Sequence, residues 1–293
     1  MPKLTLLVGP PGSGKSTWAK SLIYDDSDHG LATAYINQDL QGSDHLFLFE
    51  CALNNGKNIV VDRMNFNKAQ RSRYLDLACA SNYETEIVVL HQPYQVCYER
   101  VIARENHPTI KDEKSARGAL HTFFTKYERV QDDEADIVTR VWPEGAKEPA
   151  VLCDLDGTLC NIEHRLHFVR GEGKRDWRSF FESLRTDKLN TWCADILDRF
   201  SDTHPIVYCS GRTSDYRDLT VDWLKEKGVF FGDHLYMRMG NDFRPDDVVK
   251  EIILDFEILT RFKPYFVIDD RKRVVDMWRR RGITCLQCAD GEF

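Results

Sequence analysis

Two short motifs, one in each half of the chain, constrain its fold and chemistry more than any other feature. Residues 9–17 read GPPGSGKST and residues 154–159 read DLDGTL. Each motif directly follows an apolar run of strand length, Lys3–Val8 in the first half and Ala150–Cys153 in the second. A glycine-rich loop between a strand and a helix is typical of a phosphate-binding site, and paired aspartates at a strand end are typical of acid–base or nucleophilic chemistry. We therefore expect two separate sites, one in each half.

The length and composition of the chain fit two globular domains. Its 293 residues suit two domains of about 150 residues each, and 42% hydrophobic with 30% charged residues is ordinary for globular proteins. No apolar run approaches twenty residues and no signal-peptide pattern follows Met1, so we expect neither membrane association nor secretion. The nine cysteines form no CxxC pair and no zinc spacing, which favours a reducing, cytoplasmic compartment. The net charge of -7 argues weakly against nucleic acid, and any polyanion must be held by a local patch.

Apolar runs of strand length alternate with helix-like segments in both halves. In the first half these runs are Lys3–Val8, Thr33–Ile36, Asn58–Val61 and Glu86–Leu90. In the second half they are Ala150–Cys153, Pro205–Cys209, Leu235–Arg238, Tyr265–Ile268 and Ile283–Leu286. Strands that alternate with helices predict parallel sheets, and the aperiodic stretch WPEGAKEP at 142–149 predicts a linker. The predicted fold class is α/β, with a parallel α/β sandwich over residues 1–142, a linker over 143–149 and a second sandwich over 150–293. Four tryptophans are interpreted as core side chains: Trp142, Trp177, Trp192 and Trp223.

The first motif has the spacing G-x-x-x-x-G-K-[ST] of a P-loop. Its glycines let backbone N–H groups curl around a β-phosphate, Lys15 reaches the β and γ oxygens, and the Ser16 hydroxyl is a ligand for Mg²⁺. The residues predicted to bind ATP in this loop are Gly9, Pro10, Gly12, Ser13, Gly14, Lys15, Ser16 and Thr17. Lys15 is also expected to act in catalysis. The predicted cofactors are therefore ATP as phosphate donor and Mg²⁺.

Three further features favour a kinase over an ATPase or GTPase. Asp39 lies just past a strand, where a carboxylate is able to accept a proton from an attacking hydroxyl. Residues 62–65 read DRMN and follow the run Asn58–Val61, which places polar side chains at the sheet edge where ligands bind. Arg100 and Arg104 are one helical turn apart and are expected to close over the phosphates of ATP as a lid. A solvated helix face is the alternative for each arginine.

The second motif places two carboxylates at a strand end. Asp154 and Asp156 both face a ligand if the chain leaves the strand in a turn, so that one attacks phosphorus while the other handles the leaving-group proton. Further polar groups follow later strands, namely SGR at 210–212, Lys250 and DDR at 269–271. Such groups suit a Mg²⁺-assisted aspartyl-phosphate cycle. In this order the motifs resemble the haloacid-dehalogenase superfamily of phosphatases. A helix N-cap is the alternative for Asp269 and Asp270.

The chain as a whole resembles the family of bacteriophage polynucleotide 5′-kinase/3′-phosphatases of the T-even type. The similarity is greatest at GPPGSGKSTWAK (9–20), RPDDVVKEII (244–253) and VIDDRKRVVDMWRRRGITCLQCADGEF (267–293). The order, kinase half before phosphatase half, is also that of the phage family. This resemblance implies a P-loop kinase fold followed by a haloacid-dehalogenase Rossmann-like fold.

The resemblance also implies roles for individual residues. Asp39 is then the general base for a polynucleotide 5′-hydroxyl, and Arg104, with Arg100 beside it, binds ATP and stabilises the transferring phosphoryl group. Asp154 is the phosphatase nucleophile, and Asp156 its general acid and then base. The implied ligands of the 3′-phosphate are Arg165, Ser210, Gly211, Arg212, Asp246 and Lys250. The implied metal ligands are Ser16, Asp154, Asp156, Asp269 and Asp270.

One position departs from the phage pattern. The family has an arginine that grips the acceptor three residues after the kinase base, and this chain has Gly42 there. Arg63 stands where the family has threonine and is a candidate to supply the missing charge. Asp39, Arg63 and Asn65 form the predicted acceptor site.

Together these features predict a bifunctional end-healing enzyme. It would transfer the γ-phosphate of ATP to 5′-OH ends of RNA or DNA and hydrolyse 3′-phosphate ends, leaving ends that a ligase seals. The predicted partners are RNA and/or DNA ends and a downstream ligase, with no membrane, and the resemblance adds a homo-oligomer. Two alternatives stay open. One is a small-molecule kinase fused to a small-molecule phosphatase, which the acidic charge and Gly42 favour, and the other is a nucleic-acid-end binding module with an inactive kinase half.

Overall fold

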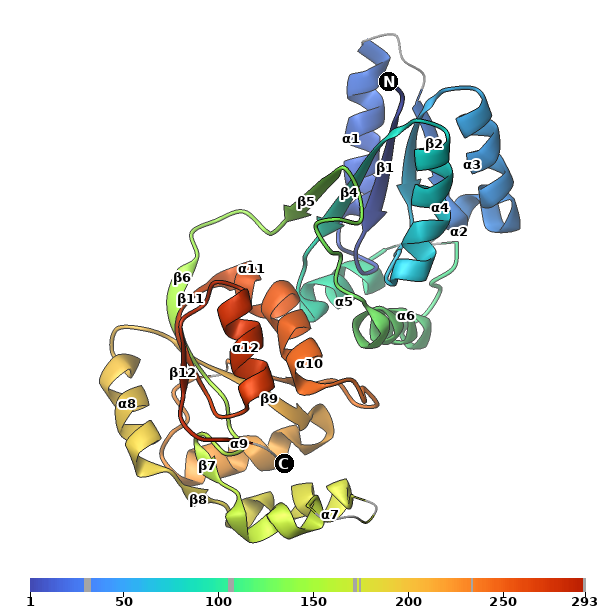
Figure 1. Cartoon of the computed structure of the whole chain (residues 1–293). Coiled ribbons are helices and arrows are strands. Elements are labelled where there is room, and N and C mark those ends of the chain that lie inside the picture. The colour runs from blue at the N-terminus through green and yellow to red at the C-terminus, as the bar shows by residue number, and fades with distance from the viewer. Residues whose placement is uncertain (29–32, 105–107, 171–172, 174, 233, 292–293) are drawn as a thin grey trace. The chain divides into compact units, whose positions relative to one another are not determined.

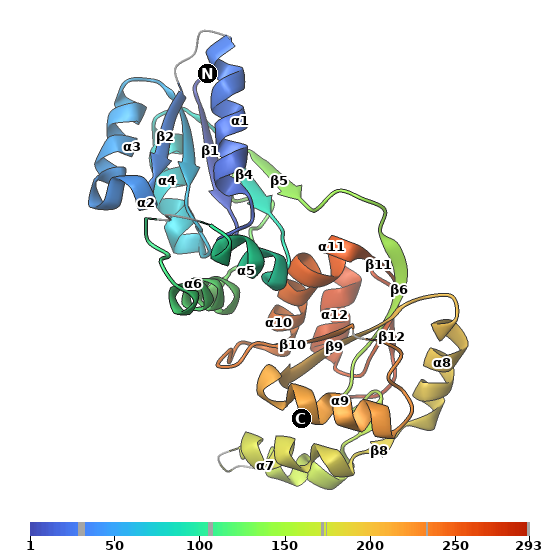
Figure 2. The same cartoon turned by 180° about the vertical axis from the view of Figure 1, so that it is seen from behind.

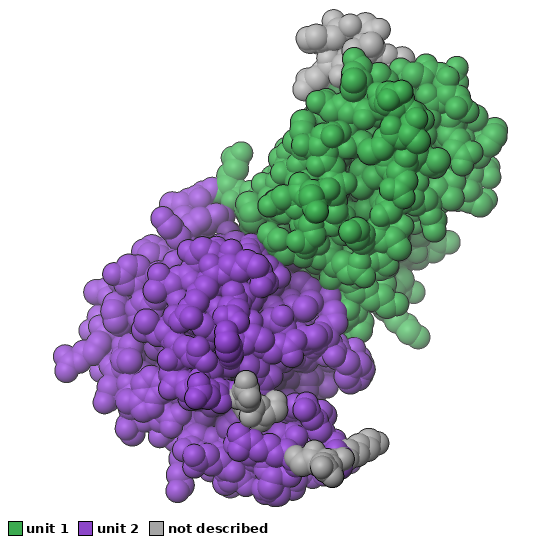
Figure 3. All heavy atoms as spheres, in the orientation of Figure 1, with its two compact units in different colours: residues 1–144 green, residues 145–293 purple. Residues whose placement is uncertain are grey.

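The chain divides into two compact units. We describe a computed structural model in which residues 1–28, 33–104, 108–170, 173, 175–232 and 234–291 are described. The first unit is Met1–Glu144 and the second Gly145–Phe293, coloured green and purple in Figure 3. Strand β5 ends at Val141 and strand β6 begins at Glu148, so the predicted linker, 143–149, lies across this division. None of the helices among the described residues is long and apolar enough to cross a membrane.

The first unit is a parallel five-stranded sheet with helices on both faces (Figure 1). Its strands, in the order β2-β3-β1-β4-β5 across the sheet, are β1 (Lys3–Val8), β2 (Thr33–Asn37), β3 (Asn58–Asp62), β4 (Glu84–Leu90) and β5 (Ile137–Val141). Its helices are α1 (Lys15–Asp28), α2 (Gln38–Gln41), α3 (His45–Asn54), α4 (Lys68–Ala80), α5 (Tyr94–Ile102) and α6 (Glu113–Lys126), with a 3-10 turn, η1, at Gly42–Asp44. Helix α1 covers one face through Ala19, which packs with Leu7 and Val88. Helices α3 and α4 cover the other face (Figures 1 and 2).

The second unit repeats this architecture with a different strand order, β10-β9-β6-β11-β12. These strands are β6 (Glu148–Cys153), β9 (Ile206–Thr213), β10 (Leu235–Arg238), β11 (Phe262–Asp269) and β12 (Cys285–Gln287). The main helices are α8 (Thr191–Ser201), α9 (Arg217–Glu226), α10 (Asp246–Ile253), α11 (Leu259–Arg261) and α12 (Lys272–Arg280), with a 3-10 turn η4 (Ser214–Tyr216) and a π-helical turn η5 (Leu254–Ile258). This unit has two hydrophobic cores, and successive residues of β6 point into different ones. Leu152 packs with α10 and α12, while Val151 packs with α8 and α9.

A smaller substructure is inserted between β6 and α8 of the second unit. It consists of β7 (Cys160–Asn161), η2 (Glu163–Phe168), α7 (Trp177–Glu182), η3 (Ser183–Thr186) and β8 (Lys188–Leu189), and β7 pairs with β8 in an antiparallel sheet. Figures 1 and 2 both show α7 apart from the five-stranded sheet. This insertion contributes side chains to the site described below.

The predicted fold class, two parallel α/β sandwiches, is confirmed. All nine predicted strands form, and two of them, Lys3–Val8 and Leu235–Arg238, have the predicted bounds. Strand β5 was not predicted, because its sequence Ile-Val-Thr-Arg-Val is polar in the middle and half exposed at the edge of its sheet. The prediction that four tryptophans lie in the core is wrong for Trp177 and Trp192, which are 40% and 43% exposed.

Candidate active sites

The P-loop joins the end of β1 to the start of α1 in the first unit. The ammonium of Lys15 donates to the carbonyls of Gly9 and Pro10 at 2.9 and 2.8 Å. Burial lowers the pKa of Lys15 to about 8, although the Asp62 carboxylate opposes this shift. Gly12 has a φ of +85°, and a Cβ there would overlap the backbone of Cys97 in α5, so this position requires glycine. The loop is therefore shaped as the motif predicted, with its lysine directed into it.

Asp62 connects the P-loop to the neighbouring strands. Its Oδ2 atom accepts hydrogen bonds from the Ser16 hydroxyl at 2.6 Å, the Tyr35 hydroxyl at 2.6 Å and the Asn37 amide at 3.0 Å. A P-loop serine paired with a strand-end aspartate is the oxygen ligand set that holds Mg²⁺ in P-loop enzymes. Ser16 and Asp62 fit such an ion. Asp62 was absent from the predicted metal ligands, although its place directly after the run Asn58–Val61 was a usable signal.

The predicted base and lid residues lie on short elements around the P-loop. Asp39 is exposed on α2. Asn37 caps this helix by accepting a hydrogen bond from the backbone N–H of Asp39 at 2.9 Å. Oδ1 of Asp39 accepts from the Thr109 hydroxyl at 2.8 Å. Arg100 and Arg104 line a cleft of about 690 Å³ together with P-loop glycines. The predicted helical turn between these arginines is wrong in one respect, because α5 ends at Ile102 and Arg104 lies beyond it. The structure nevertheless brings both arginines to the P-loop.

The predicted acceptor residues behave differently from one another. Arg63 is half-buried, and its guanidinium donates to the Tyr74 hydroxyl at 2.7 Å. Asn65 is 1% exposed and its amide donates to the Leu7 carbonyl at 2.8 Å, so this side chain is turned into the sheet and not towards an acceptor. Gly42 has a φ of +58° and a ψ of -131° at the end of α2, a conformation that disfavours an arginine. An arginine at this position would therefore be strained.

The second site is built at the carboxyl ends of β6 and β11. The buried ammonium of Lys250 donates to Oδ1 of Asp154 at 2.6 Å and to Oδ2 of Asp269 at 2.8 Å. Asp269 also accepts from the indole N–H of Trp278 at 3.2 Å, which fixes its orientation. Burial lowers the pKa of Lys250 less than the two carboxylates raise it, so the lysine stays charged. One buried cation therefore serves two aspartates predicted to be catalytic or metal-binding.

Three carboxylates meet at this point. One oxygen each of Asp154, Asp269 and Asp270 lies within 4.8 Å of the others. Burial raises the pKa of Asp154, and burial together with the Asp269 charge raises the pKa of Asp270 to about 6. A divalent cation removes such mutual repulsion, and carboxylate oxygens are the ligands that Mg²⁺ prefers. These three aspartates fit Mg²⁺. Gly157 leaves room for them, since a Cβ there would overlap the Asp270 carboxylate.

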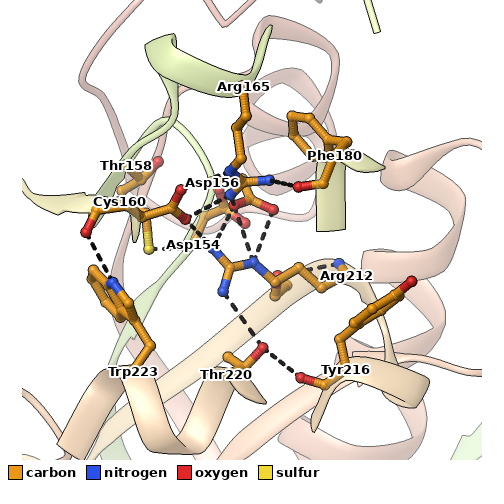
Figure 4. Close-up of polar contacts among 12 residues, drawn as sticks. Asp154, Asp156, Thr158, Cys160, Arg165, Phe180, Arg212, Tyr216, Thr220 and Trp223 are labelled. Atoms are coloured by element: carbon orange, nitrogen blue, oxygen red, sulfur yellow. Dashed lines mark hydrogen bonds and ion pairs between the residues drawn. The ribbon is translucent and has the colours of Figure 1, made fainter. Parts of the chain in front are cut away.

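Asp156 lies outside this group of three and is held by two arginines (Figure 4). Arg212 donates to it from Nε and Nη2, and Arg165 donates from Nη2. Burial raises the pKa of Asp156, but the Arg212 and Arg165 charges outweigh it and hold the pKa well below the ordinary range. Arg165 and Arg212 are 0% exposed, so the structure gives them a carboxylate partner where we had expected a phosphate. Asp156 likewise lies with the arginines and not among the metal-site carboxylates.

Asp187 completes this cluster and was missed. It is 1% exposed and accepts from Nε and Nη2 of Arg165 at 2.7 Å each and from Nη2 of Arg212 at 3.0 Å. It belongs to the inserted substructure, immediately before β8, and no recognisable motif surrounds it. Two carboxylates thus neutralise two buried guanidinium groups, an arrangement that burial requires.

The remaining predicted phosphate ligands lie on the β9 and α10 side of the site. Ser210 is buried, and its hydroxyl accepts from the backbone N–H of Arg212 at 3.2 Å. Gly211 lies against Asp246, whose carboxylate a Cβ would meet at 3.0 Å. Asp246 in turn forms ion pairs with Arg238 and Arg271. Asp246 therefore anchors two arginines at the site. Arg238 was not predicted, and Arg271 was named only as the last residue of the DDR motif, with no role of its own.

These groups open into one cleft of about 720 Å³. Its lining includes Asp154, Asp156, Lys250, Asp269 and Asp270. The structure thereby brings together residues separated by more than a hundred positions in the sequence.

Comparison with protein families identifies both units. Residues 148–293 match the family model for the polynucleotide kinase PNKP phosphatase domain, of haloacid-dehalogenase type, and residues 4–130 match an AAA domain model. The second unit belongs to the polynucleotide kinase phosphatase family. In this chain that phosphatase domain follows a P-loop domain, as the resemblance predicted. The match spans the whole sheet of the second unit and the Asp154, Lys250 and Asp269 site.

Individual relatives and one solved structure are similar to this chain over different shares of its length. A protein of Autographa californica nuclear polyhedrosis virus, named as a putative bifunctional polynucleotide kinase/RNA ligase, is 26% identical over 94% of this chain. A protein of Acanthamoeba polyphaga mimivirus, named as a putative bifunctional polynucleotide phosphatase/kinase, is 31% identical over 31% of this chain. The chain spans 41% and 21% of their lengths. The solved structure of a Pnkp1/Rnl/Hen1 complex aligns over 100% of this chain and 98% of that chain, with 26% identity and a TM-score of 0.43.

Proposed function

We propose that the chain is a bifunctional nucleic-acid end-healing enzyme. The match to the phosphatase family carries this proposal. The same chain also has a P-loop, in which Lys15 donates to the Gly9 carbonyl and Ser16 donates to Asp62. The first unit would phosphorylate 5′-OH ends, and the second would remove 3′-phosphates. The products, a 5′-phosphate and a 3′-OH, are the ends that a ligase joins.

In the phosphatase, Asp154 is the proposed nucleophile. Its carboxylate oxygen forms a bond to the phosphorus of the 3′-phosphate while the bond from phosphorus to O3′ breaks, and the released O3′ takes a proton to become a hydroxyl. Water then attacks the aspartyl-phosphate, which releases inorganic phosphate and restores Asp154. Lys250 holds the nucleophile in place through its 2.6 Å hydrogen bond. Mg²⁺ held by Asp154, Asp269 and Asp270 would supply positive charge next to the phosphate oxygens.

Asp156 is the proposed proton-transfer group, and its surroundings favour one direction of transfer. Arg165 and Arg212 hold it as a carboxylate, which suits accepting a proton from the attacking water. Donating a proton to O3′ requires the neutral acid, and the two arginine charges disfavour that form. The contacts therefore support the base role of Asp156 more strongly than the acid role.

In the kinase, Asp39 is the proposed base. It would accept the proton of a 5′-hydroxyl whose oxygen bonds to the γ-phosphorus as the bond to ADP breaks. Arg100 and Arg104 line the cleft at the P-loop and Lys15 belongs to the loop itself, and these three cations would neutralise the transferred phosphoryl group. Mg²⁺ would bind Ser16 and Asp62 and offset phosphate charge.

The proposed substrates are RNA or DNA ends, with a ligase acting afterwards. The baculovirus relative, whose name combines polynucleotide kinase with RNA ligase, supports RNA ends and a ligase partner. Self-association is proposed from the phage resemblance alone. ATP and Mg²⁺ are the proposed cofactors.

Loss of the nucleophile tests this proposal. Asp154→Asn should abolish phosphate release from a 3′-phosphorylated oligonucleotide and leave phosphorylation of a 5′-OH oligonucleotide unchanged. Lys15→Met should give the opposite pattern, so each variant serves as the other's control. Wild-type protein that acts on free nucleosides, nucleotides or sugars but on no oligonucleotide would instead support a small-molecule kinase–phosphatase.

A further inference from the structure

The helix that carries the proposed kinase base is held by polar contacts and not by the core. Helix α2 has four residues, Gln38–Gln41, and none of them is buried. So short a helix has too few internal hydrogen bonds to be stable alone, and α2 buries no apolar side chain that would offset this cost. The position of Asp39 therefore depends on the side chains that bond to this helix.

Asn37 holds the start of α2. It is the last residue of β2 and also the N-cap of α2, with an extended backbone of φ -134° and ψ 117°. Its Oδ1 atom accepts from the backbone N–H groups of Asp39 at 2.9 Å and of Leu40 at 3.2 Å. At the other end of the helix, Nε2 of Gln41 donates to the Tyr35 carbonyl at 3.0 Å. The amide oxygen of Asn37 thus fixes the turn that contains Asp39.

The amide nitrogen of Asn37 bonds to the pair that fits Mg²⁺. Asn37 and Asp62 are register partners at the ends of the parallel strands β2 and β3. Nδ2 of Asn37 donates to Oδ2 of Asp62 at 3.0 Å and to the Tyr35 hydroxyl at 2.9 Å. The same Oδ2 atom accepts from Tyr35 and from Ser16 of the P-loop, at 2.6 Å each. One side chain therefore contacts both the P-loop pair and the helix of the proposed base.

Both sets of contacts require an amide. An amide has two N–H donors on its nitrogen and two acceptor positions on its oxygen, and Asn37 uses all four. The side chain is only 6% exposed, so water does not replace these partners. Aspartate and serine are also good N-caps, but aspartate has no donor for Asp62 and serine ends one atom earlier in the side chain. Asparagine is thus the residue that joins the two sites.

We propose that Asn37 is a positioning residue of the kinase, which holds the proposed base Asp39 in a fixed place relative to the Ser16–Asp62 pair. Phosphoryl transfer requires the attacking oxygen, its base and the γ-phosphorus in a precise arrangement, and a displacement of about 1 Å lowers the rate strongly. Nucleotide binding depends on the P-loop itself, so loss of the Asn37 amide should affect turnover more than ATP binding. This role rests on the proposed kinase activity.

Two substitutions that keep the helix cap test this role in the full-length chain. Asn37→Asp and Asn37→Ser retain a good N-cap but lose the amide donors, and the aspartate adds a negative charge beside Asp62. With ATP and a 5′-OH oligonucleotide, each should lower kcat roughly 10- to 100-fold with little change in the KM for ATP. A retained KM also shows that the first unit is folded. Asn67→Asp and Asn67→Ser, the same changes at the N-cap of α4, are the matched controls and should change neither parameter.

Hydrogen exchange gives a readout that does not depend on catalysis. Hydrogen–deuterium exchange is measured by mass spectrometry, with and without Mg²⁺ and the non-hydrolysable ATP analogue adenylyl imidodiphosphate. In the wild-type chain, this nucleotide should slow exchange in the peptide that contains Gln38–Gln41, because a fixed Asp62 also fixes Asn37. Asn37→Ser should remove this slowing, although the analogue still binds.

Three results would overturn the inference. Full kinase activity in both Asn37 variants would show that Asn37 only caps α2. Exchange that does not slow in the wild-type chain would show that the two sites are not coupled, and slowing that persists in Asn37→Ser would show that α2 responds to nucleotide without Asn37. Wild-type protein that phosphorylates no oligonucleotide would refute the proposed kinase activity, whereas the exchange experiment needs no acceptor and tests the coupling by itself.

Discussion

The ammonium of Lys250 lies 2.6 Å from a carboxylate oxygen of Asp154, and both groups are buried. The same ammonium reaches Asp269, which lies beside Asp270. Lys250 thus forms ion pairs with two of the three clustered carboxylates, Asp154 and Asp269. Three carboxylates beside one lysine leave the site short of positive charge, which a divalent cation would offset.

Replacement of Lys250 by methionine should destabilise the second unit and abolish phosphatase activity. It leaves buried aspartates without a partner, which costs about 3–5 kcal/mol. Thermal unfolding in the presence of a chelator measures the loss, and added Mg²⁺ should recover part of it. Lys263→Met, at an exposed lysine of β11, is the control. An unfolding temperature unchanged by Lys250→Met would contradict the description of this site.

Asp187→Asn should lower the kcat of the phosphatase with little effect on KM. Asp187 does not line the cleft, but it accepts from both guanidinium groups that hold Asp156. We expect kcat to fall roughly 10- to 100-fold, the effect of losing a group that orients a catalytic residue. Asp187→Glu should not restore it, because the buried site has no room. A change confined to KM would show that Asp187 acts on substrate binding.

Arg63→Ala should weaken use of the 5′-OH acceptor and spare ATP binding. Arg63 lies directly after β3 and donates to Tyr74, while Gly42 offers no charge. Kinase assays at varied oligonucleotide concentration should show a higher acceptor KM or a lower kcat. Arg73→Ala, at an exposed arginine of α4, provides the comparison. If neither acceptor parameter changes, Arg63 does not replace the missing arginine.

The thiols should differ sharply in reactivity. Burial raises the pKa of Cys285 to about 12, whereas Cys79 is exposed. Alkylation by iodoacetamide at pH 8, read by mass spectrometry, should modify Cys79 and leave Cys285 intact until the protein unfolds. Because the folded pKa lies above the ordinary value of 9.0, Cys285 contributes its full stability below about pH 9 and loses it as pH rises towards 12. Rapid labelling of Cys285 in folded protein would contradict its buried placement.

The strands and both motif loops were predictable because they carry local signals. Continuous apolar runs such as Lys3–Val8 are typical of strands covered on both faces, and P-loop residues act through consecutive backbone groups. Strand β5 lacked this signal because an edge strand with Thr139 and Arg140 at its centre is covered on less of its surface. Asp62 was placed at the correct strand end, but its hydrogen bond to Ser16 depends on how β3 lies beside β1.

The contacts of the arginines could not be predicted from spacing. The SGR motif placed Arg212 at the site and the family resemblance placed Arg165 there. Only the fold shows that both meet Asp156, and that Asp187 from the inserted substructure joins them. Asn65 illustrates the opposite error, because its place after β3 suggested a ligand while a left-handed φ of +45° turns its amide into the sheet. Side-chain direction at such turns depends on backbone angles that the sequence does not state.

The central claim is that one chain acts on both ends of a nucleic-acid break. It is tested most directly by incubating the protein with Mg²⁺, γ-labelled ATP and an oligonucleotide that carries a 5′-OH and a 3′-phosphate, in RNA and DNA versions. We predict labelled 5′ ends together with released 3′-phosphate, and the ratio of RNA to DNA turnover gives the preferred substrate. An oligonucleotide that gains no label and keeps its 3′-phosphate would contradict the claim.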